Sequence, residues 1–120
     1  MKFDLLFLTL IGCGHCFVVI DVNIYGSLSC PTSFKSRVNV WEEDHKWHQC
    51  VGRWSDFADS ESNPRADKRY HKDYKVSGEA YDGFWEWDVE LFATYEHFCG
   101  GAHKCFCVDL GHHGWSFEKN

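Results

Sequence analysis

The amino-acid sequence predicts an all-β fold, a small antiparallel β-sandwich or barrel stapled by disulfides. Apolar and polar residues alternate along several segments, aromatic residues make up 18% of the chain, and there are only two prolines. A period of two is typical of strands that bury one face, and short strands separated by turns are typical of sandwiches and barrels. At 120 residues the chain fits one domain, in which large rings supply much buried area.

Four segments carry the strand pattern. In the first, Ile20, Val22 and Ile24 alternate with polar residues, and Tyr25-Gly26-Ser27 can turn the chain. The second is residues 34–40, the third is the long run of residues 81–95, and the last is residues 106–110. In the third run most odd positions are apolar and most even positions are acidic, which predicts one buried and one wet face. Its length favours a bend or hairpin near Gly83.

Residues 56–75 are polar and rich in turn-forming residues, including Asn63-Pro64. We expect an exposed loop here, since few of its residues could join a core. Lys68-Arg69 within it is a dibasic pair, which is a candidate site for a secretory processing protease.

The N-terminus has the layout of a secretory leader. Lys2 supplies a positive start, Leu5–Ile11 is apolar, and Gly12 and Gly14 are small residues near a cleavage site. We therefore predict a signal peptide at residues 1–16 and a secreted, extracellular domain at residues 17–120. A buried strand or helix and a lipoprotein acylation site at Cys13 are the alternatives. The apolar run is too short for a membrane span.

The predicted mature domain keeps Cys30, Cys50, Cys99, Cys105 and Cys107. In a small secreted chain such residues staple the fold more often than they bind metal. Five is an odd number, so one thiol is free or pairs with another chain. The formal net charge of −6 disfavours a nucleic-acid partner, which usually meets a basic surface.

The stretch Glu43-Asp44-His45-Lys46-Trp47-His48-Gln49-Cys50 resembles a motif of the Alternaria major-allergen-like family of small secreted fungal proteins. Residues 75–77, 93–101 and 106–108 are similar to further family elements. The resemblance implies the bridges Cys30–Cys50 and Cys99–Cys107, with Cys99–Cys105 as a competitor for the second. It leaves Cys105 unpaired or interchain, and it places Trp47 beside the first bridge. The family's N-terminal cysteine for an interchain bridge has no counterpart here.

The resemblance further implies a secreted effector or elicitor that binds a host extracellular or plant defence protein, in the apoplast for example. It implies no catalysis, cofactor, metal, nucleic acid or membrane partner. Two surfaces are candidates for the contact. One is the acidic strand face, Asp82, Glu86, Asp88 and Glu90, and the other is the polar loop at residues 56–72.

Three other functions are open. Residues 81–87 are similar to elements of small microbial guanyl-specific ribonucleases, for which Glu86, His71, His112 and Arg69 could be the base, acids and phosphate ligand. The ribonucleases keep these two elements apart, whereas here they form one segment. An inactive ribonuclease-like protein is therefore favoured over an active one. Exposed Trp54, Trp85 or Trp115 could bind a glycan. His45 with His48, or the group Cys99, His103, Cys105, Cys107, His112 and His113, could bind zinc.

Overall fold

The computed structural model describes residues 2–3, 18–43, 48–58, 60–82 and 88–114. At residues 2–3, 18–20, 81–82, 88–89 and 112–114 it describes the backbone alone. The predicted leader at residues 1–16 lies outside the described part except for Lys2 and Phe3, whose backbone pairs with Ser29 and Leu28. The described residues contain no helix long and apolar enough to cross a membrane.

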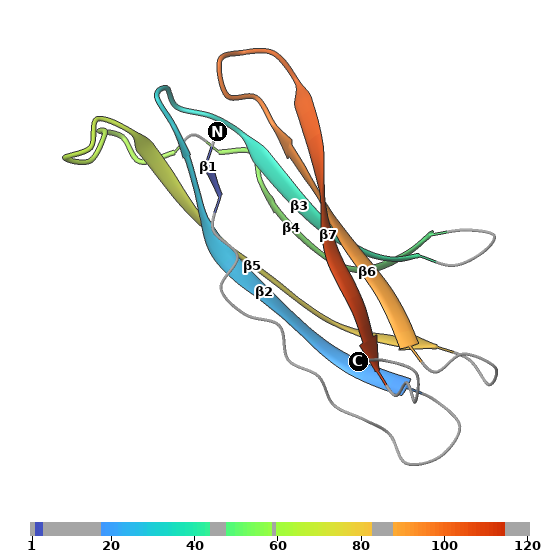
Figure 1. The fold of residues 1–120 in the computed structure, drawn as a ribbon. Helices are drawn as coiled ribbons and strands as arrows, with labels where there is room; N and C mark the ends of the chain where they lie inside the picture. Colours follow the sequence, from blue (N-terminus) through green and yellow to red (C-terminus); the bar gives the residue numbers. More distant parts are fainter. Residues whose placement is uncertain (1, 4–17, 44–47, 59, 83–87, 115–120) are drawn as a thin grey trace.

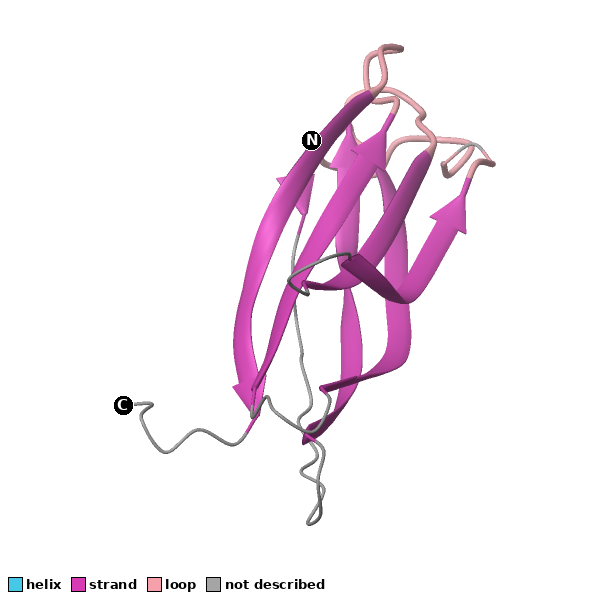
Figure 2. Ribbon diagram, turned by 90° about the vertical axis from the view of Figure 1, so that its right-hand side faces the viewer, coloured by secondary structure: helices cyan, strands magenta, loops and turns pink. Residues whose placement is uncertain are grey.

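The described residues form two antiparallel sheets that face each other (Figures 1 and 2). The strands are β1 (Lys2–Phe3), β2 (Val18–Cys30), β3 (Ser36–Glu43), β4 (His48–Asp56), β5 (Tyr70–Asp82), β6 (Asp88–His97) and β7 (Lys104–Gly114). Sheet A has the order β1-β2-β5, and sheet B has the order β4-β3-β6-β7. The described loops gather at one end of the sandwich, here called the loop end (Figure 2). The all-β, disulfide-stapled fold predicted from the sequence is therefore confirmed.

The core lies between the inner faces of the sheets, as strand alternation requires. Its fully buried side chains come from both sheets and include Val22, Ile24, Leu28, Val38, Val40, Tyr74, Val76 and Tyr95. An aromatic cluster runs through the centre. Tyr74 packs edge-on against Tyr95 with ring centroids 5.6 Å apart, and Tyr95 stacks on Phe106 at 5.0 Å. Among the described residues, Phe34, Tyr74 and Tyr95 are thus the aromatic side chains that lie fully inside the sandwich.

Two predicted turns or loops are strands in the structure. β2 runs without interruption through Tyr25-Gly26-Ser27, which pairs with residues 73–75 of β5. The predicted loop ends at Arg69, because β5 begins at Tyr70 and buries Lys72 and Tyr74 to 5% and 2% exposure. Because residues 70–75 are mostly polar, the sequence pattern did not predict this part of the strand. Lys72 is tolerated inside because two backbone carbonyls accept from its ammonium group, at 3.1 and 2.5 Å.

The long alternating run is divided between the sheets. β5 ends at Asp82 in sheet A, and β6 begins at Asp88 in sheet B, so the run is not one strand. In the described residues β5 pairs with β2, and β6 pairs with β3 and β7. The bend or hairpin expected near Gly83 lies outside the described residues. The predicted alternation holds in β6, where Leu91, Ala93 and Tyr95 are buried.

Two glycines let the sheets approach along one side of the sandwich. A Cβ atom on Gly78 of β5 would lie 2.2 Å from the carbonyl oxygen of Val51 in β4. A Cβ atom on Gly52 would lie 2.8 Å from the carbonyl oxygen of Ser77. Val51 is the extra residue of a bulge in β4, where Val40 pairs with Gly52 and Trp41 with Cys50. Neither position has room for a larger residue.

The single described disulfide joins Cys30 to Cys99, so the predicted pairs Cys30–Cys50 and Cys99–Cys107 are wrong. Cys30 ends β2 and Cys99 follows β6, which puts both at the loop end, with Cα atoms 5.8 Å apart. Cys50 lies opposite Trp41, six residues before β4 reaches that end, or about 20 Å along the strand. Cys107 lies opposite Thr94 and Cys105 opposite Glu96, and both are exposed free thiols, as is Cys50. The competing bridge Cys99–Cys105 is therefore also wrong.

Candidate protein-contact site

A pocket of about 270 Å³ opens at the loop end of sheet B, between two of the most exposed large apolar side chains that the structure describes. Phe57 is 46% exposed and Phe98 is 37% exposed. We call it the Phe57–Phe98 pocket; its lining residues are Lys35, Arg37, Phe57, Glu96, Phe98 and His103. They come from the start of β3 and the residue before it, from the loop after β4, and from the end of β6 with the turn that joins it to β7.

The floor of the pocket is an ion pair between neighbouring strands. Arg37 and Glu96 lie opposite each other in the register of β3 and β6. The Arg37 guanidinium donates to both carboxylate oxygens of Glu96, at 2.7 and 3.1 Å. This bidentate bond holds the pKa of Glu96 below its usual range and raises that of Arg37. Arg37 also lies over the Phe57 ring, 5.5 Å from its centroid, so the ion pair fixes one aromatic wall.

The second wall is the turn between β6 and β7. The Phe98 amide donates to the Lys35 carbonyl at 3.0 Å, and the Gly101 amide donates to the Phe98 carbonyl at 3.1 Å. Gly100 and Gly101 have φ of 81° and 90°, which glycine adopts without strain. The ring of His103 packs 5.1 Å from that of Phe98, and its Nε2 lies 3.3 Å from a Glu96 oxygen. The Cys30–Cys99 bridge anchors this turn to sheet A.

The loop that carries Phe57 is held from beneath by Lys72. The Lys72 ammonium donates to the carbonyls of Asp56 and Ala58, on either side of Phe57. It also lies 5.2 Å from the centroid of the buried Phe34 ring and 3.6 Å from the Asp56 carboxylate. The Ala58 amide donates to that carboxylate at 2.9 Å. Phe57 is therefore presented to solvent by a fixed segment of backbone.

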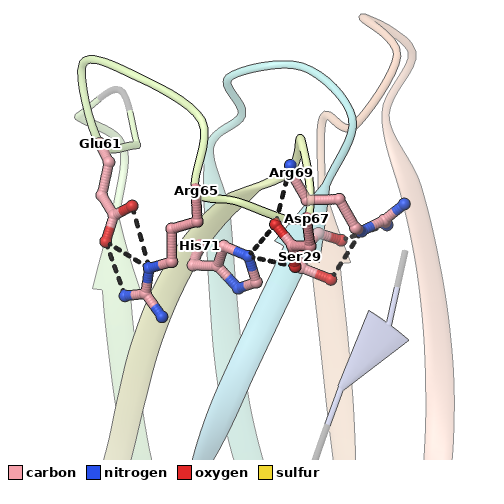
Figure 3. A network of polar contacts seen from close by, with 6 residues as sticks. All are labelled: Ser29, Glu61, Arg65, Asp67, Arg69 and His71. Atoms are coloured by element: carbon pink, nitrogen blue, oxygen red, sulfur yellow. Dashed lines mark hydrogen bonds and ion pairs between the residues drawn. The ribbon is translucent and has the colours of Figure 1, made fainter.

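The rest of the loop is tied together by polar contacts at the tip of sheet A (Figure 3). Arg65 donates to both oxygens of Glu61, and the Asp67 carboxylate lies 2.8 Å from His71 Nε2. Arg69 donates to the hydroxyl and the carbonyl of Ser29, at 3.0 and 3.1 Å. The His71 contact lowers the pKa of Asp67. Glu61 neutralises Arg65, and Arg69 ties the loop to β2 through Ser29, so the network shapes the loop.

The pocket joins an unneutralised cation to apolar walls. Among the described residues Lys35 makes no ion pair, whereas Arg37 is neutralised by Glu96. Exposed aromatic rings beside a cation are typical of the anchors of protein interfaces. No group of three or more His, Cys, Asp or Glu residues in the described part of the chain is arranged to hold a metal ion.

The acidic residues predicted as a contact surface do not share one strand face. Asp82 ends β5 in sheet A, and Asp88 begins β6 in sheet B. Glu90 is half-buried, and Glu86 lies outside the described residues. The predicted polar loop does contribute to the pocket, through Phe57.

The residues nominated for a ribonuclease are separated. His71 and Arg69 lie together at the loop end, where His71 pairs with Ser29. His112 pairs with Glu90 near the start of β6, at the other end of the sandwich. Asp82, eleven residues beyond His71, is about 36 Å away along β5, and Glu86 follows it outside the described residues. His71 and Arg69 therefore lie too far from His112 for one substrate to contact all three residues.

The nominated tryptophans and metal ligands give a mixed result. Trp54 is half-buried, and its ring lies 6.2 Å from that of Tyr74. Trp85, Trp115, Trp47 and His45 lie outside the described residues. Cys99 of the predicted zinc cluster is oxidised in the disulfide, and only the backbone of His112 and His113 is described.

Sequence analysis missed Lys35, Arg37, Glu96 and Phe98 as site residues. The sequence signal that could have found this site is a large aromatic residue directly after an alternating strand, as Phe98 is after β6. Comparison of the chain with protein-family models, curated proteins and solved structures finds no match.

Proposed function

We propose that this chain is a secreted effector or elicitor that acts without catalysis, by binding another protein through the Phe57–Phe98 pocket. The observation that carries the contact proposal is the pair of exposed rings held rigidly on either side of Arg37. Rigid aromatic anchors lose little conformational entropy on binding, which makes them efficient interface residues. The disulfide is compatible with an extracellular location, and the predicted leader supports it.

The partner that this pocket fits carries an acidic group next to an apolar side chain. The apolar group would insert between Phe57 and Phe98, and the acidic group would pair with Lys35. The fungal origin and the host target are implied by the resemblance of the Glu43–Cys50 stretch and of residues 75–77, 93–101 and 106–108 to the family.

The test compares matched surface variants. Purified protein is infiltrated into leaf tissue, and cell death and defence-gene induction are measured. The double variant Phe57→Ala/Phe98→Ala should lose the response, and Lys35→Glu should weaken it. Tyr25→Ala removes an exposed ring from sheet A and should retain it. All variants must unfold at the wild-type temperature. An unchanged response of the double variant would contradict the proposed site, and no response to the wild type would contradict the elicitor role.

A glycan-binding function is the second candidate. A cleft of about 650 Å³ is lined by the aromatic residues Tyr25, Trp54 and Tyr74 and by Asp73 and Lys75. Rings beside polar groups are suited to sugars, which present apolar faces and hydroxyls. The same variants separate the two functions. Loss of binding to cell-wall oligosaccharides in Tyr25→Ala, with binding intact in Phe57→Ala/Phe98→Ala, would favour the glycan function.

A further inference from the structure

Two exposed thiols share one face of a sheet-edge strand. Cys105 and Cys107 lie on the outer face of β7, the last strand of sheet B, while Phe106 between them points into the core. In the described part of the chain β7 pairs with β6 alone. A bulge at Leu110, followed by Gly111 with φ of 83°, ends the regular stretch. The regular edge therefore consists of residues 104–109.

Among the cysteines that the structure describes, neither thiol has a partner within one chain, and Cys13 and Cys16 belong to the predicted leader outside the described residues. Cys105 and Cys107 are two residues apart on one strand face, so their Cβ atoms lie about 6.6 Å apart, while a disulfide needs roughly 4 Å. Cys50 lies on β4, at the opposite edge of the four-stranded sheet, about 14 Å away across three strand spacings. An oxidising environment therefore directs Cys105 and Cys107 toward another molecule.

We propose that β7 pairs antiparallel with β7 of a second copy about a twofold axis at Phe106, and that two bridges join Cys105 of each copy to Cys107 of the other. This register places Cys105 opposite the partner's Cys107 and Cys107 opposite the partner's Cys105. Directly opposed residues in antiparallel strands have Cα atoms about 4.5–5.5 Å apart, which is within disulfide range.

The same register places a histidine opposite a carboxylate and continues sheet B. His103, which directly precedes β7 on the same outer face, comes opposite the partner's Asp109 at each end of the pairing. A contact about a twofold axis joins the same surface of both copies. The outer residues of β7 bring both thiols opposite thiols of the partner only when the axis lies at Phe106. Registers centred on Cys105 or Cys107 would give one bridge and would oppose the other thiol to His103 or Asp109.

Formation of each bridge is an ordinary thiol–disulfide exchange. One Cys105 thiol and one Cys107 thiol lose two protons and two electrons to a low-molecular-weight disulfide such as glutathione disulfide, which becomes two thiols. Burial, with smaller effects of Cys107 and Glu96, raises the pKa of Cys105, so the reaction is faster at mildly alkaline pH. In the organism, this oxidation requires the extracellular location proposed above. The pairing of the two β7 strands does not depend on that location.

The test uses purified protein oxidised with glutathione disulfide and analysed by non-reducing electrophoresis. We expect a dimer for the wild type and for the control Cys50→Ser. Both Cys105→Ser and Cys107→Ser should remain monomeric, because each removes one end of both bridges. A mixture of these two variants, one carrying an affinity tag, should form the heterodimer through the single remaining Cys105–Cys107 bridge. Peptide mapping after cleavage at Phe106 should recover that linkage.

Other outcomes would overturn the register. A dimer that persists in Cys107→Ser would mean a Cys105–Cys105 bridge, and one that persists in Cys105→Ser would mean a Cys107–Cys107 bridge. Loss of the dimer in Cys50→Ser, or no dimer in any sample, would exclude pairing through β7. The Phe57→Ala/Phe98→Ala variant should dimerise normally, so failure of the proposed function and failure of this dimer are distinguishable.

Discussion

The hydroxyl groups of Tyr74 and Tyr95 lie 2.9 Å apart in the centre of the sandwich, one from each sheet. Their rings meet edge to face, and both side chains are at most 2% exposed. Burial raises the pKa of Tyr95, and either hydroxyl can donate to the other. This hydrogen bond joins the two sheets through their polar atoms as well as through packing.

Replacing either tyrosine by Phe should destabilise the fold, because it leaves the other hydroxyl without this partner. We expect about 1–2 kcal/mol for each single variant in urea denaturation. The double variant Tyr74→Phe/Tyr95→Phe should cost less than the sum, since neither hydroxyl then remains. Strict additivity would mean that the two hydroxyls do not interact in solution.

Removing the buried cation at Lys72 should free the loop that carries Phe57. Lys72→Met leaves the carbonyls of Asp56 and Ala58 without their donor, at a cost of roughly 1–3 kcal/mol. Protease cleavage within residues 57–69 should become faster. Lys75→Met, on the exposed face of the same strand, is the control and should match the wild type. Equal cleavage of both variants would contradict the proposed role of Lys72.

A methyl group at position 78 should separate the two sheets along the β4–β5 side. Gly78→Ala places a carbon where the Val51 carbonyl lies, so the backbone must move, at a cost of roughly 1–3 kcal/mol. The exposed neighbour variant Glu79→Ala should be nearly neutral. Thermal unfolding measures both. A wild-type melting temperature for Gly78→Ala would show that the strands are farther apart than described.

His97 should make the fold sensitive to mild acid. Burial, together with Lys104 and His103, lowers its pKa, and its Nδ1 accepts from the Cys99 amide at 3.1 Å. The unfolded chain binds a proton at His97 below about pH 6.5, and the folded chain does so only at lower pH. Its stabilising contribution is therefore complete above that pH and declines below it, by at most about 1.4 kcal/mol per pH unit.

The variant His97→Asn tests this pH dependence, because Asn retains an acceptor near the Nδ1 position and does not titrate. Urea denaturation at a series of pH values should show a shallower decline for the variant than for the wild type just below pH 6.5. Parallel curves for the two proteins would assign the acid sensitivity to carboxylates such as Glu96.

Limited trypsin digestion should distinguish the observed disulfide from the predicted ones. Cleavage after Lys68 or Arg69 divides the chain between Cys30 and Cys99, so the halves should separate in denaturant only after reduction. The Cys30→Ser variant should separate without reductant. Loss of a bridge that closes about 70 residues should also cost roughly 4 kcal/mol. Separation of the wild-type halves without reductant would contradict the bridge Cys30–Cys99.

Much of the strand content was predictable because it depends on local alternation. Val38 and Val40 in β3, and Leu91, Ala93 and Tyr95 in β6, lie inward as their spacing predicts. The start of β5 was not predictable, because Lys72 occupies an inner position that the pattern assigns to an apolar residue. The pocket could not be predicted either, since its residues come from three segments that only the pairing of β3 with β6 and the closure of the loops bring together.

The sequence by itself determined the all-β class, the inward positions of most strands and the presence of a disulfide, because each follows from residue type and short-range spacing. Only the tertiary structure decided which cysteines pair. Cys30 and Cys99 are 69 residues apart, and they meet because β2 of sheet A and β6 of sheet B both end at the loop end of the sandwich. The partners of a cysteine depend on where strands end in space, which the local pattern of a chain does not contain.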